Sequence, residues 1–157
     1  LLKDFSRVAY IGGPAHVQTA RERGEGWREA HRRRGIEAPA DLLRFDSFLV
    51  DGGRRVTEEL LSLPEPPDAV VAGNNLIGVG VLQVLAERGL TPPRVGVAVI
   101  GSLPFTTLSP TAVTIIRLPA REMGMTAARL LLDRIAGGAG PSRTVVLQAE
   151  LWPAARS

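Results

Sequence analysis

The sequence predicts an α/β fold in which a mostly parallel, Rossmann-like sheet carries helices on both faces. Two observations lead to this prediction: short apolar runs alternate with amphipathic segments along the chain, and Gly or Pro lies at most of the boundaries. Strands that alternate with helices pair in parallel, because each helix returns the chain to the same end of the sheet. The 157 residues suffice for one domain with one hydrophobic core.

Six short apolar runs are the candidate strands of this sheet. Runs of this kind, bounded by turn residues, are typical of strands that are buried on both faces. In chain order they are residues 7–11, 42–45, 69–72, 95–100, 113–116 and 144–147.

Four segments between these runs predict helices, because their apolar residues recur at the spacing that places them on one helix face. The first two are residues 16–33 and a segment that follows Asp51-Gly52-Gly53 and carries Val56, Leu60 and Leu61. The other two are residues 76–88 and a segment opened by Pro119, with Met123, Ala127, Leu130, Leu131 and Ile135 on one face. Gly35, Gly89 and Gly137-Gly138 follow three of these helices, as is common at helix ends.

The segment from Val70 to Gly80 is the most informative part of the chain for function. Its apolar run ends in Asn74 and Asn75, and a helix rich in small residues follows at once. A buried parallel strand delivers polar side chains in this way to the carboxyl edge of an open sheet, where such folds bind ligands. One asparagine is expected to cap the helix and the other to be free for a ligand such as a sugar. The sequence therefore predicts a small-molecule receptor.

Two further groups of residues are candidates for the same site. Thr19 and Arg23 are four positions apart, so a helix places them on one face, where they can hold a polyol, a carboxylate or a base edge. A solvated helix face is the simpler interpretation of that pair. Ser47 and Phe48 follow the second strand, where an aromatic ring can stack on a ring-shaped ligand. A place in the core is the alternative for this aromatic, and for Phe45 it is the preferred one.

Composition and charge exclude several classes of protein. Hydrophobic residues make up 45% and charged residues 22%, as in ordinary globular domains, and the absence of cysteine excludes disulfides and thiolate chemistry. No apolar run reaches the roughly 20 residues that span a bilayer, and the printed start shows no export signal. The pI is about 10.5, but the net charge is only +3. The cluster of Arg28 with Arg32, Arg33 and Arg34 is therefore interpreted as a solvated helix end rather than a nucleic-acid surface.

We expect no catalytic site, no metal and no cofactor. His16 and His31, the only histidines, lie on one predicted helix with no cysteine to join them in a metal site. Gly12-Gly13-Pro14 follows a strand, as a phosphate loop would, but proline lacks the amide that cradles a phosphate. This segment is interpreted as a tight turn.

A series of short motifs runs in order over nearly the whole chain, at residues 8–14, 19–23, 26–30, 46–52, 72–80, 88–90, 93, 97–101, 117–127, 150–151 and 156–157. The ordered set resembles the effector-binding region of the lactose-repressor and purine-repressor family of bacterial transcription regulators. The resemblance implies a two-lobed fold like that of type 1 periplasmic sugar-binding proteins. Residues 1–117 and about 149–157 would belong to the C-terminal lobe, and residues 118–148 to the N-terminal lobe. Most of the N-terminal lobe and the DNA-binding headpiece would lie outside this partial domain.

The resemblance also implies particular ligand contacts. Arg23 matches the arginine that holds the effector in the cleft, and Thr19 matches a nearby polar contact. Ser47 or Phe48 matches the position that stacks on a ring, and Asn74 matches the effector-binding asparagine.

Two positions depart from the family pattern. Asn75 stands where aspartate is usual, and residues 101–105 read Gly-Ser-Leu-Pro-Phe where the family commonly has two aspartates before a comparable Pro-Phe. The first of those aspartates usually binds sugar hydroxyls. Either the protein binds something less polyhydroxylated, or a loop is missing from the sequence; Ser102 is the nearest substitute.

The expected function is the sensing of a small polar metabolite, such as a sugar, by a cytoplasmic repressor. Effector binding between the lobes would change the lobe angle in a homodimer and so the spacing of two headpieces on operator DNA. The expected dimer face comprises Leu76, Val79, Leu82, Leu103 and Phe105. For Leu82, burial within the lobe is the alternative.

Two rival functions share parts of this pattern. A secreted sugar-binding protein of a transporter has the same fold and would be distinguished by an export signal upstream. An α/β enzyme would need a catalytic acid, base or metal, and Asp46, Asn74 and Arg23 do not form one. We expect neither an enzyme nor a membrane-bound protein.

Overall fold

A six-stranded sheet forms the centre of the computed structural model, which describes residues 5–103, 112–138 and 140–154. The strand order is β2-β1-β3-β4-β5-β6; β1 to β5 are parallel, and β6 is antiparallel to β5. The strands are β1 (Val8–Gly12), β2 (Leu43–Phe45), β3 (Ala69–Ala72), β4 (Gly96–Ile100), β5 (Thr114–Arg117) and β6 (Glu150–Trp152). The predicted mostly parallel α/β fold is confirmed.

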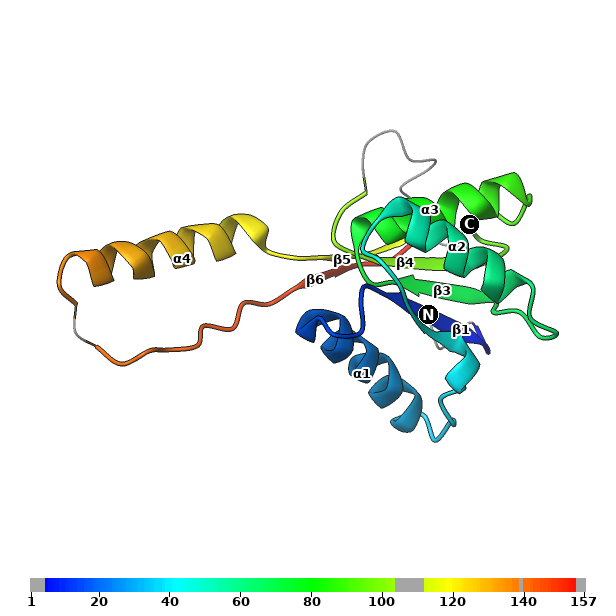
Figure 1. Cartoon of the computed structure of the whole chain (residues 1–157), viewed down its shortest axis with the longest axis horizontal. Coiled ribbons are helices and arrows are strands. Elements are labelled where there is room, and N and C mark those ends of the chain that lie inside the picture. The colour runs from blue at the N-terminus through cyan, green and yellow to red at the C-terminus, as the bar shows by residue number, and fades with distance from the viewer. Residues whose placement is uncertain (1–4, 104–111, 139, 155–157) are drawn as a thin grey trace.

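Helices cover both faces of this sheet, as Figure 1 shows. Helix α1 (Gln18–Arg32) lies on one face, and α2 (Val50–Leu61) and α3 (Asn75–Glu87) lie side by side on the other. A short 3-10 turn, η1 (Ala40–Leu42), leads into β2. The arrangement follows from right-handed crossovers: the chain moves one way along the sheet from β1 to β2, and the opposite way from β2 to β4.

The helices α2 and α3 pack with their backbones in contact. A Cβ on Gly80 would lie 2.3 Å from the carbonyl oxygen of Val50, and a Cβ on Gly53 would lie 2.5 Å from that of Ile77. Glycine at these positions is therefore required by the packing. The sequence analysis placed Gly52 and Gly53 before the helix, whereas α2 already begins at Val50. That expectation was wrong because Gly53 is a helix residue packed against α3, while Gly52 lies against the turn after β2, where a Cβ would be 2.4 Å from the Oγ of Ser47.

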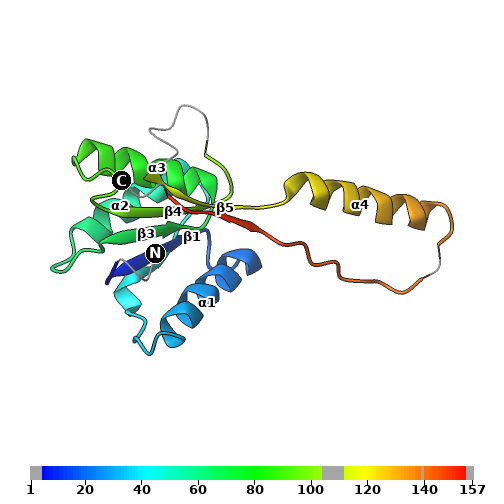
Figure 2. The same ribbon diagram turned by 180° about the vertical axis from the view of Figure 1, so that it is seen from behind.

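Helix α4 (Ala120–Ile135) and the extended residues after it form an arm that projects from the sheet (Figures 1 and 2). No residue of α4 is buried, and Leu131, Leu132 and Ile135 are 61%, 65% and 72% exposed. The strand predicted at residues 144–147 is wrong, because they pair with no strand of the described residues. A strand forms instead at residues 150–152, where β5 offers a partner for the backbone N–H and C=O groups.

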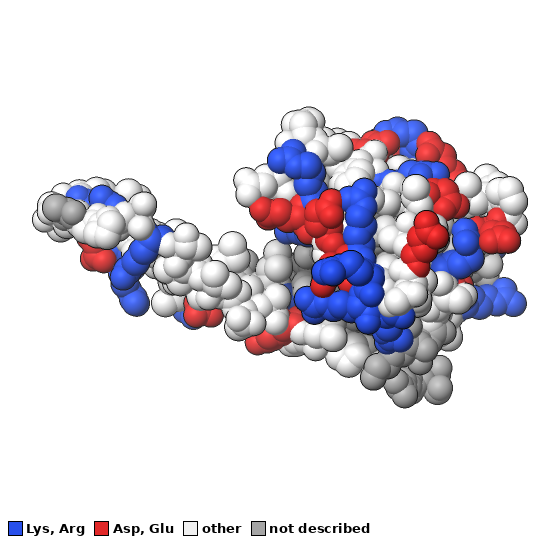
Figure 3. Space-filling model, turned by 90° about the horizontal axis from the view of Figure 1, so that it is seen from below, with Lys and Arg blue, Asp and Glu red and all other residues white. Residues whose placement is uncertain are grey.

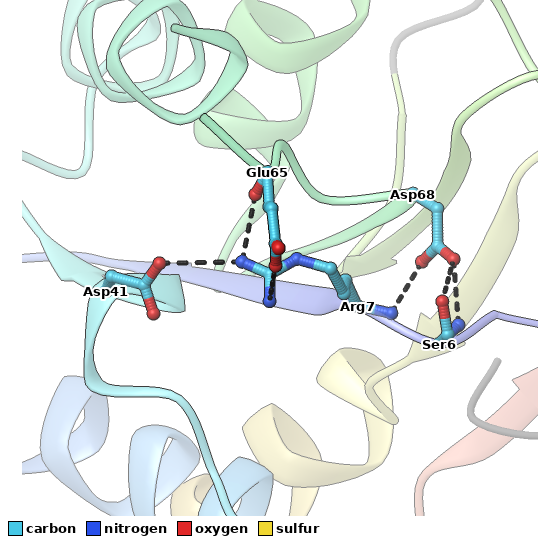
Figure 4. A network of polar contacts seen from close by, with 5 residues as sticks. All are labelled: Ser6, Arg7, Asp41, Glu65 and Asp68. Carbon is cyan, nitrogen blue, oxygen red and sulfur yellow. Dashed lines mark hydrogen bonds and ion pairs between the residues drawn. The ribbon is translucent and has the colours of Figure 1, made fainter. Parts of the chain in front are cut away.

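A polar network joins the amino ends of the central strands (Figure 4). The carboxylate of Asp68 accepts hydrogen bonds from the backbone N and Oγ of Ser6, both at 2.8 Å, and from the backbone N of Arg7 at 2.9 Å. Arg7 in turn donates to the carbonyl of Glu65 at 2.9 Å and pairs with Asp41 at 3.5 Å. Burial would raise the pKa of Asp68, but these hydrogen bonds leave that pKa below its ordinary value. This end of the sheet is thus fixed by structural contacts.

Candidate functional site

The opposite edge of the sheet holds the carboxyl ends of β1 to β5, and the arm leaves the body from this edge (Figure 1). Every described ligand residue that the sequence predicted lies on a turn at this edge or in the first two turns of the helix that follows. These residues are Thr19, Arg23, Ser47, Phe48, Asn74 and Ser102.

Arg23 reaches this edge from the face that carries α1. Its Nη1 donates a 2.7 Å hydrogen bond to the carbonyl of Gly73, the residue that follows β3. Thr19, one helical turn earlier, is exposed. Burial raises the pKa of the neighbouring Tyr10 to about 12, against the opposing charge of Arg23, and the Tyr10 hydroxyl donates to the carbonyl of Ala20 at 3.3 Å. Tyr10 is therefore neutral, and the guanidinium is the charged group at this strand end.

Asn74 is the residue that caps helix α3. Its Oδ1 accepts a 2.8 Å hydrogen bond from the backbone N of Ile77, and its Nδ2 donates to the carbonyl of Phe48 at 3.0 Å. An asparagine amide can make about four hydrogen bonds, and the described residues use one donor and one acceptor position of Asn74. Arg23 and Asn74 thus meet the same strand end, but the amide is directed to the layer of α2 and α3.

The turn after β2 is held by contacts within the protein. The ring of Phe48 lies against the turn after β1, since a Cβ on Gly13 would lie 2.2 Å from that ring. The Oγ of Ser47 accepts a long hydrogen bond, 3.4 Å, from the backbone N of Leu49. Arg55 donates to both carboxylate oxygens of Asp46, at 2.6 and 3.1 Å, and holds the pKa of that carboxyl below its ordinary value. Phe45 packs against the core, as predicted.

Two hollows open near the predicted residues. The first, about 860 Å³, lies between α1 and the sheet, and Arg23, Tyr10, Trp27, Val71 and Ile100 are among its lining residues. The second, about 740 Å³, lies at the ends of β4 and β5 and contains Ser102. Thr19, Ser47, Phe48 and Asn74 line neither of these two hollows. The chain therefore brings the predicted residues to one edge but distributes them around it.

The second hollow contains Asn75, the other asparagine of the pair, and three charged residues that were not predicted as ligand contacts, Arg117, Arg121 and Glu122. Asn75 is exposed in the first turn of α3, since Asn74 takes the capping position before it. The sequence predicted that one asparagine of the pair would be free, but not which one. Arg117 ends β5. It is the one charged residue in the sequence from Gly101 to Pro119, and this isolated charge was the available signal for it.

The charged residues of α1 form a mixed surface. Arg28 pairs with Glu25, and Arg32 and Arg33 both pair with Glu29. Figure 3, which looks at the face that carries α1, shows basic and acidic side chains interspersed there. His31 is buried, with Nδ1 3.0 Å from the carbonyl of Trp27. All four arginines of the cluster are exposed, which confirms the prediction of a solvated helix end.

A comparison with protein families accounts for this architecture. Residues 2–153 match the periplasmic binding protein-like domain. The chain belongs to this family. The resemblance inferred from the ordered motifs is thereby confirmed at the level of fold and family.

The relatives of this periplasmic binding protein-like domain are transcription regulators of the LacI type. The HTH-type transcriptional regulator CelR of Thermobifida fusca is 35% identical over 147 residues, which are 92% of this chain and 43% of CelR. The ribose operon repressor of Escherichia coli K12 is 36% identical over 135 residues, which are 85% of this chain and 41% of the repressor. The chain thus spans less than half the length of these relatives.

Solved structures of the same kind share the fold. The complex of the transcriptional regulator CelR with cellobiose superposes with a TM-score of 0.83 at 31% identity, covering 97% of this chain and 47% of that chain. A LacI family transcriptional regulator from Mycobacterium smegmatis gives a TM-score of 0.83 at 29% identity, covering 95% of this chain and 56% of that chain. These neighbours are regulators, which favours the predicted regulatory function over the transporter alternative.

The residues expected at a dimer face differ in exposure within this domain. Leu76 is 37% exposed, Val79 and Leu103 are half-buried, and Leu82 is only 6% exposed. Phe105 lies outside the described residues. No helix in the described ranges is both long and apolar enough to cross a membrane.

Proposed function

We propose that the chain is the effector-sensing part of a cytoplasmic, LacI-type transcription regulator that binds a small polar metabolite. The observation that carries the proposal is the family match of residues 2–153 together with Arg23, which meets the end of β3 at the carbonyl of Gly73. Parallel sheets of this kind bind ligands outside the carboxyl ends of their strands. The complex of CelR with cellobiose supports a sugar as the ligand class.

The proposed ligand contacts are those of the strand-end turns. Arg23 supplies a charged donor, and the amide of Asn74 has a second donor and a second acceptor position beyond those used in the described residues. Thr19, Ser47 and Ser102 supply hydroxyls, and Phe48 supplies a ring for stacking. These residues would form one wall of a cleft, and the opposite wall would come from a second lobe.

The exposed apolar residues of the arm favour a protein with two lobes. We propose that residues 1–117 and 149–157 belong to the C-terminal lobe and residues 118–148 to the N-terminal lobe. Helix α4 exposes Met123, Leu131 and Ile135, so the free energy gained by burying apolar area favours a partner layer on that face. The second lobe would provide that layer.

Ligand binding between two lobes would regulate DNA binding by a shift of conformation. An effector that binds one lobe angle more tightly stabilises it by its difference in affinity for the two states. In a twofold homodimer, the lobe angle would set the spacing of two DNA-reading headpieces on the operator. The proposed dimer face comprises Leu76, Val79, Leu103 and Phe105, whereas Leu82 is buried within this lobe, as the alternative for it had it. No enzymatic step or cofactor enters this mechanism.

The proposal is tested with the natural gene product that contains this chain. Calorimetry with a panel of mono- and disaccharides that includes cellobiose and ribose should find a ligand, and that ligand should change the affinity for operator DNA. Arg23→Ala should weaken its binding about tenfold or more, because a charged hydrogen bond contributes roughly 1.5–3 kcal/mol. Arg28→Ala, an exposed change on the same helix, is the control. Unchanged operator binding with every sugar would contradict the proposal.

A further inference from the structure

Three polar side chains lie together at the ends of β3, β4 and β5. Asn75, Ser102 and Arg117 all line the hollow of about 740 Å³ at this edge. The strand ends are in direct contact there, since a Cβ on Gly101 would lie 3.6 Å from the backbone N and the Cβ of Asn75. The backbone N of Gly101 also donates to the carbonyl of Ile116, which precedes Arg117, at 2.9 Å. An amide, a hydroxyl and a guanidinium thus share one space.

The lining of this hollow carries a net positive charge, although Glu150, the partner of Arg117 in the pairing of β5 with β6, lies next to it. The charged side chains that line the hollow are Arg117, Arg121 and Glu122, so two guanidinium groups lie there with one carboxylate. The sequence from Gly101 to Ile116 contains no charged residue that could add an acidic group. Across the same edge, Asp46 is already bound by Arg55 through both carboxylate oxygens. Arg23 adds a further guanidinium at Gly73.

The guanidinium of Arg117 lies over an aromatic ring of β6. Its Cζ lies 4.8 Å from the centre of the Trp152 ring, and the Trp152 Nε1 donates to Glu150 at 3.0 Å. Stacking occupies a face of a guanidinium, whereas its N–H groups lie in its plane. Arg117 can therefore stack on the indole and donate to a ligand at the same time. A planar guanidinium matches two oxygens of a carboxylate or phosphate.

We propose that the ligand of this site carries an oxyanion, a carboxylate or a phosphate, which Arg117 binds with Asn75 and Ser102 as neutral partners. The proposal rests on the proposed function, because it takes this edge to be the effector site. Sugar hydroxyls without an anion gain most from carboxylate acceptors, whereas the lining of this hollow has more charged donors than carboxylates. The anionic group would lie toward β4 and β5, and the remainder of the ligand toward β3 and Arg23.

The test is calorimetry of the gene product that contains this chain with ribose, ribonate and ribose 5-phosphate. Inorganic phosphate and acetate are measured alone. We expect at least one of the two anionic sugars to bind about tenfold more tightly than ribose, and the better one identifies the oxyanion as carboxylate or phosphate. Arg117→Gln should remove this advantage and leave ribose binding unchanged, and Arg117→Lys should restore part of it.

The control is Arg94→Gln, which removes the same charge at the other end of the sheet, where Arg94 donates to the carbonyl of Gly89 at 3.0 Å. It should leave the preference for anionic sugars intact. If Arg117→Gln and Arg94→Gln lose equal affinity for the anionic sugars, the protein attracts anions in general and the proposal is overturned. Inorganic phosphate that binds as tightly as ribose 5-phosphate would overturn it in the same way. If a neutral sugar alone binds and alters operator affinity, the oxyanion proposal fails while the regulator proposal stands. If no compound alters operator affinity, the regulator proposal fails.

Discussion

Helices α3 and α4 are both apolar along one side, but the body of the molecule buries α3 and leaves α4 exposed. In α3, Ile77, Val81 and Leu85 are fully buried against the sheet and α2, whereas no residue of α4 is buried. Both segments were predicted as helices from the same spacing of apolar residues. The difference teaches that this spacing indicates a face that needs a partner, but not where in the structure the partner lies.

The largest expected difference between α3 and α4 is in the free energy of unfolding that is lost when a leucine is replaced by alanine. Leu85→Ala should lower the free energy of unfolding by about 2–5 kcal/mol, because it removes a fully buried side chain and leaves a cavity. Leu131→Ala, at a 61% exposed position of α4, should change it by less than about 0.5 kcal/mol. Urea denaturation of this chain measures both. Similar losses would show that α4 is packed in solution. A much larger loss for Leu131→Ala in the natural gene product would support the second lobe.

The next difference is in glycine substitution. Gly80→Ala should destabilise the chain by about 1–3 kcal/mol, because its Cβ would lie 2.3 Å from the carbonyl oxygen of Val50 and force α2 away from α3. Gly124→Ala should stabilise α4 by about 0.5–1 kcal/mol, because no other part of the structure lies within 4 Å of the new Cβ. Thermal unfolding followed by circular dichroism distinguishes the two. Equal shifts in Tm would contradict the backbone contact of α2 and α3.

A smaller difference is expected at the helix starts, since Asn74 caps α3 whereas Pro119 gives α4 no side-chain cap. Asn74→Ala should cost about 1–2 kcal/mol through loss of the hydrogen bonds to Ile77 and Phe48. Asn74→Asp keeps the acceptor for the Ile77 backbone N and should cost less. Denaturation without ligand measures this structural role separately from ligand binding. A stability of Asn74→Ala equal to that of the original chain would disprove the capping contact.

The smallest effect depends on pH. Asp68→Asn should cost about 1 kcal/mol at pH 7, where the carboxylate accepts from Ser6 and Arg7. The folded-state pKa of Asp68 is lowered, so its stabilisation is complete above the ordinary pKa of 3.8 and is lost as the pH falls through the lower folded value. In urea denaturation at pH 7, 5 and 3, the free energies of unfolding of the original chain and of Asp68→Asn should become more similar toward pH 3. Asp133→Asn on the arm is the control. A stability difference between the original chain and Asp68→Asn that stays constant with pH would contradict the stabilising role of the Asp68 carboxylate.

Much of the site was predictable because it depends on backbone pattern. Strand ends, helix starts and glycine turns are local features, and the alternation of strands and helices places Thr19, Arg23, Ser47, Asn74 and Ser102 at one edge. Which hydrogen bonds these side chains make could not be predicted in the same way. The partner of Asp46 is Arg55, and the second partner of Asn74 is the carbonyl of Phe48, on a different turn.

The sequence by itself determined the order of the strands and helices, the parallel sheet and the edge at which polar residues gather. These follow from hydrophobic spacing and chain connectivity, which are properties of neighbouring residues. Only the tertiary structure decided that Asn74 caps α3 while Asn75 is exposed, that residues 144–147 form no strand, and that Arg117 lines the same hollow as Ser102. Each of these depends on which distant backbone or side chain is within hydrogen-bonding or packing distance, and no local pattern specifies that.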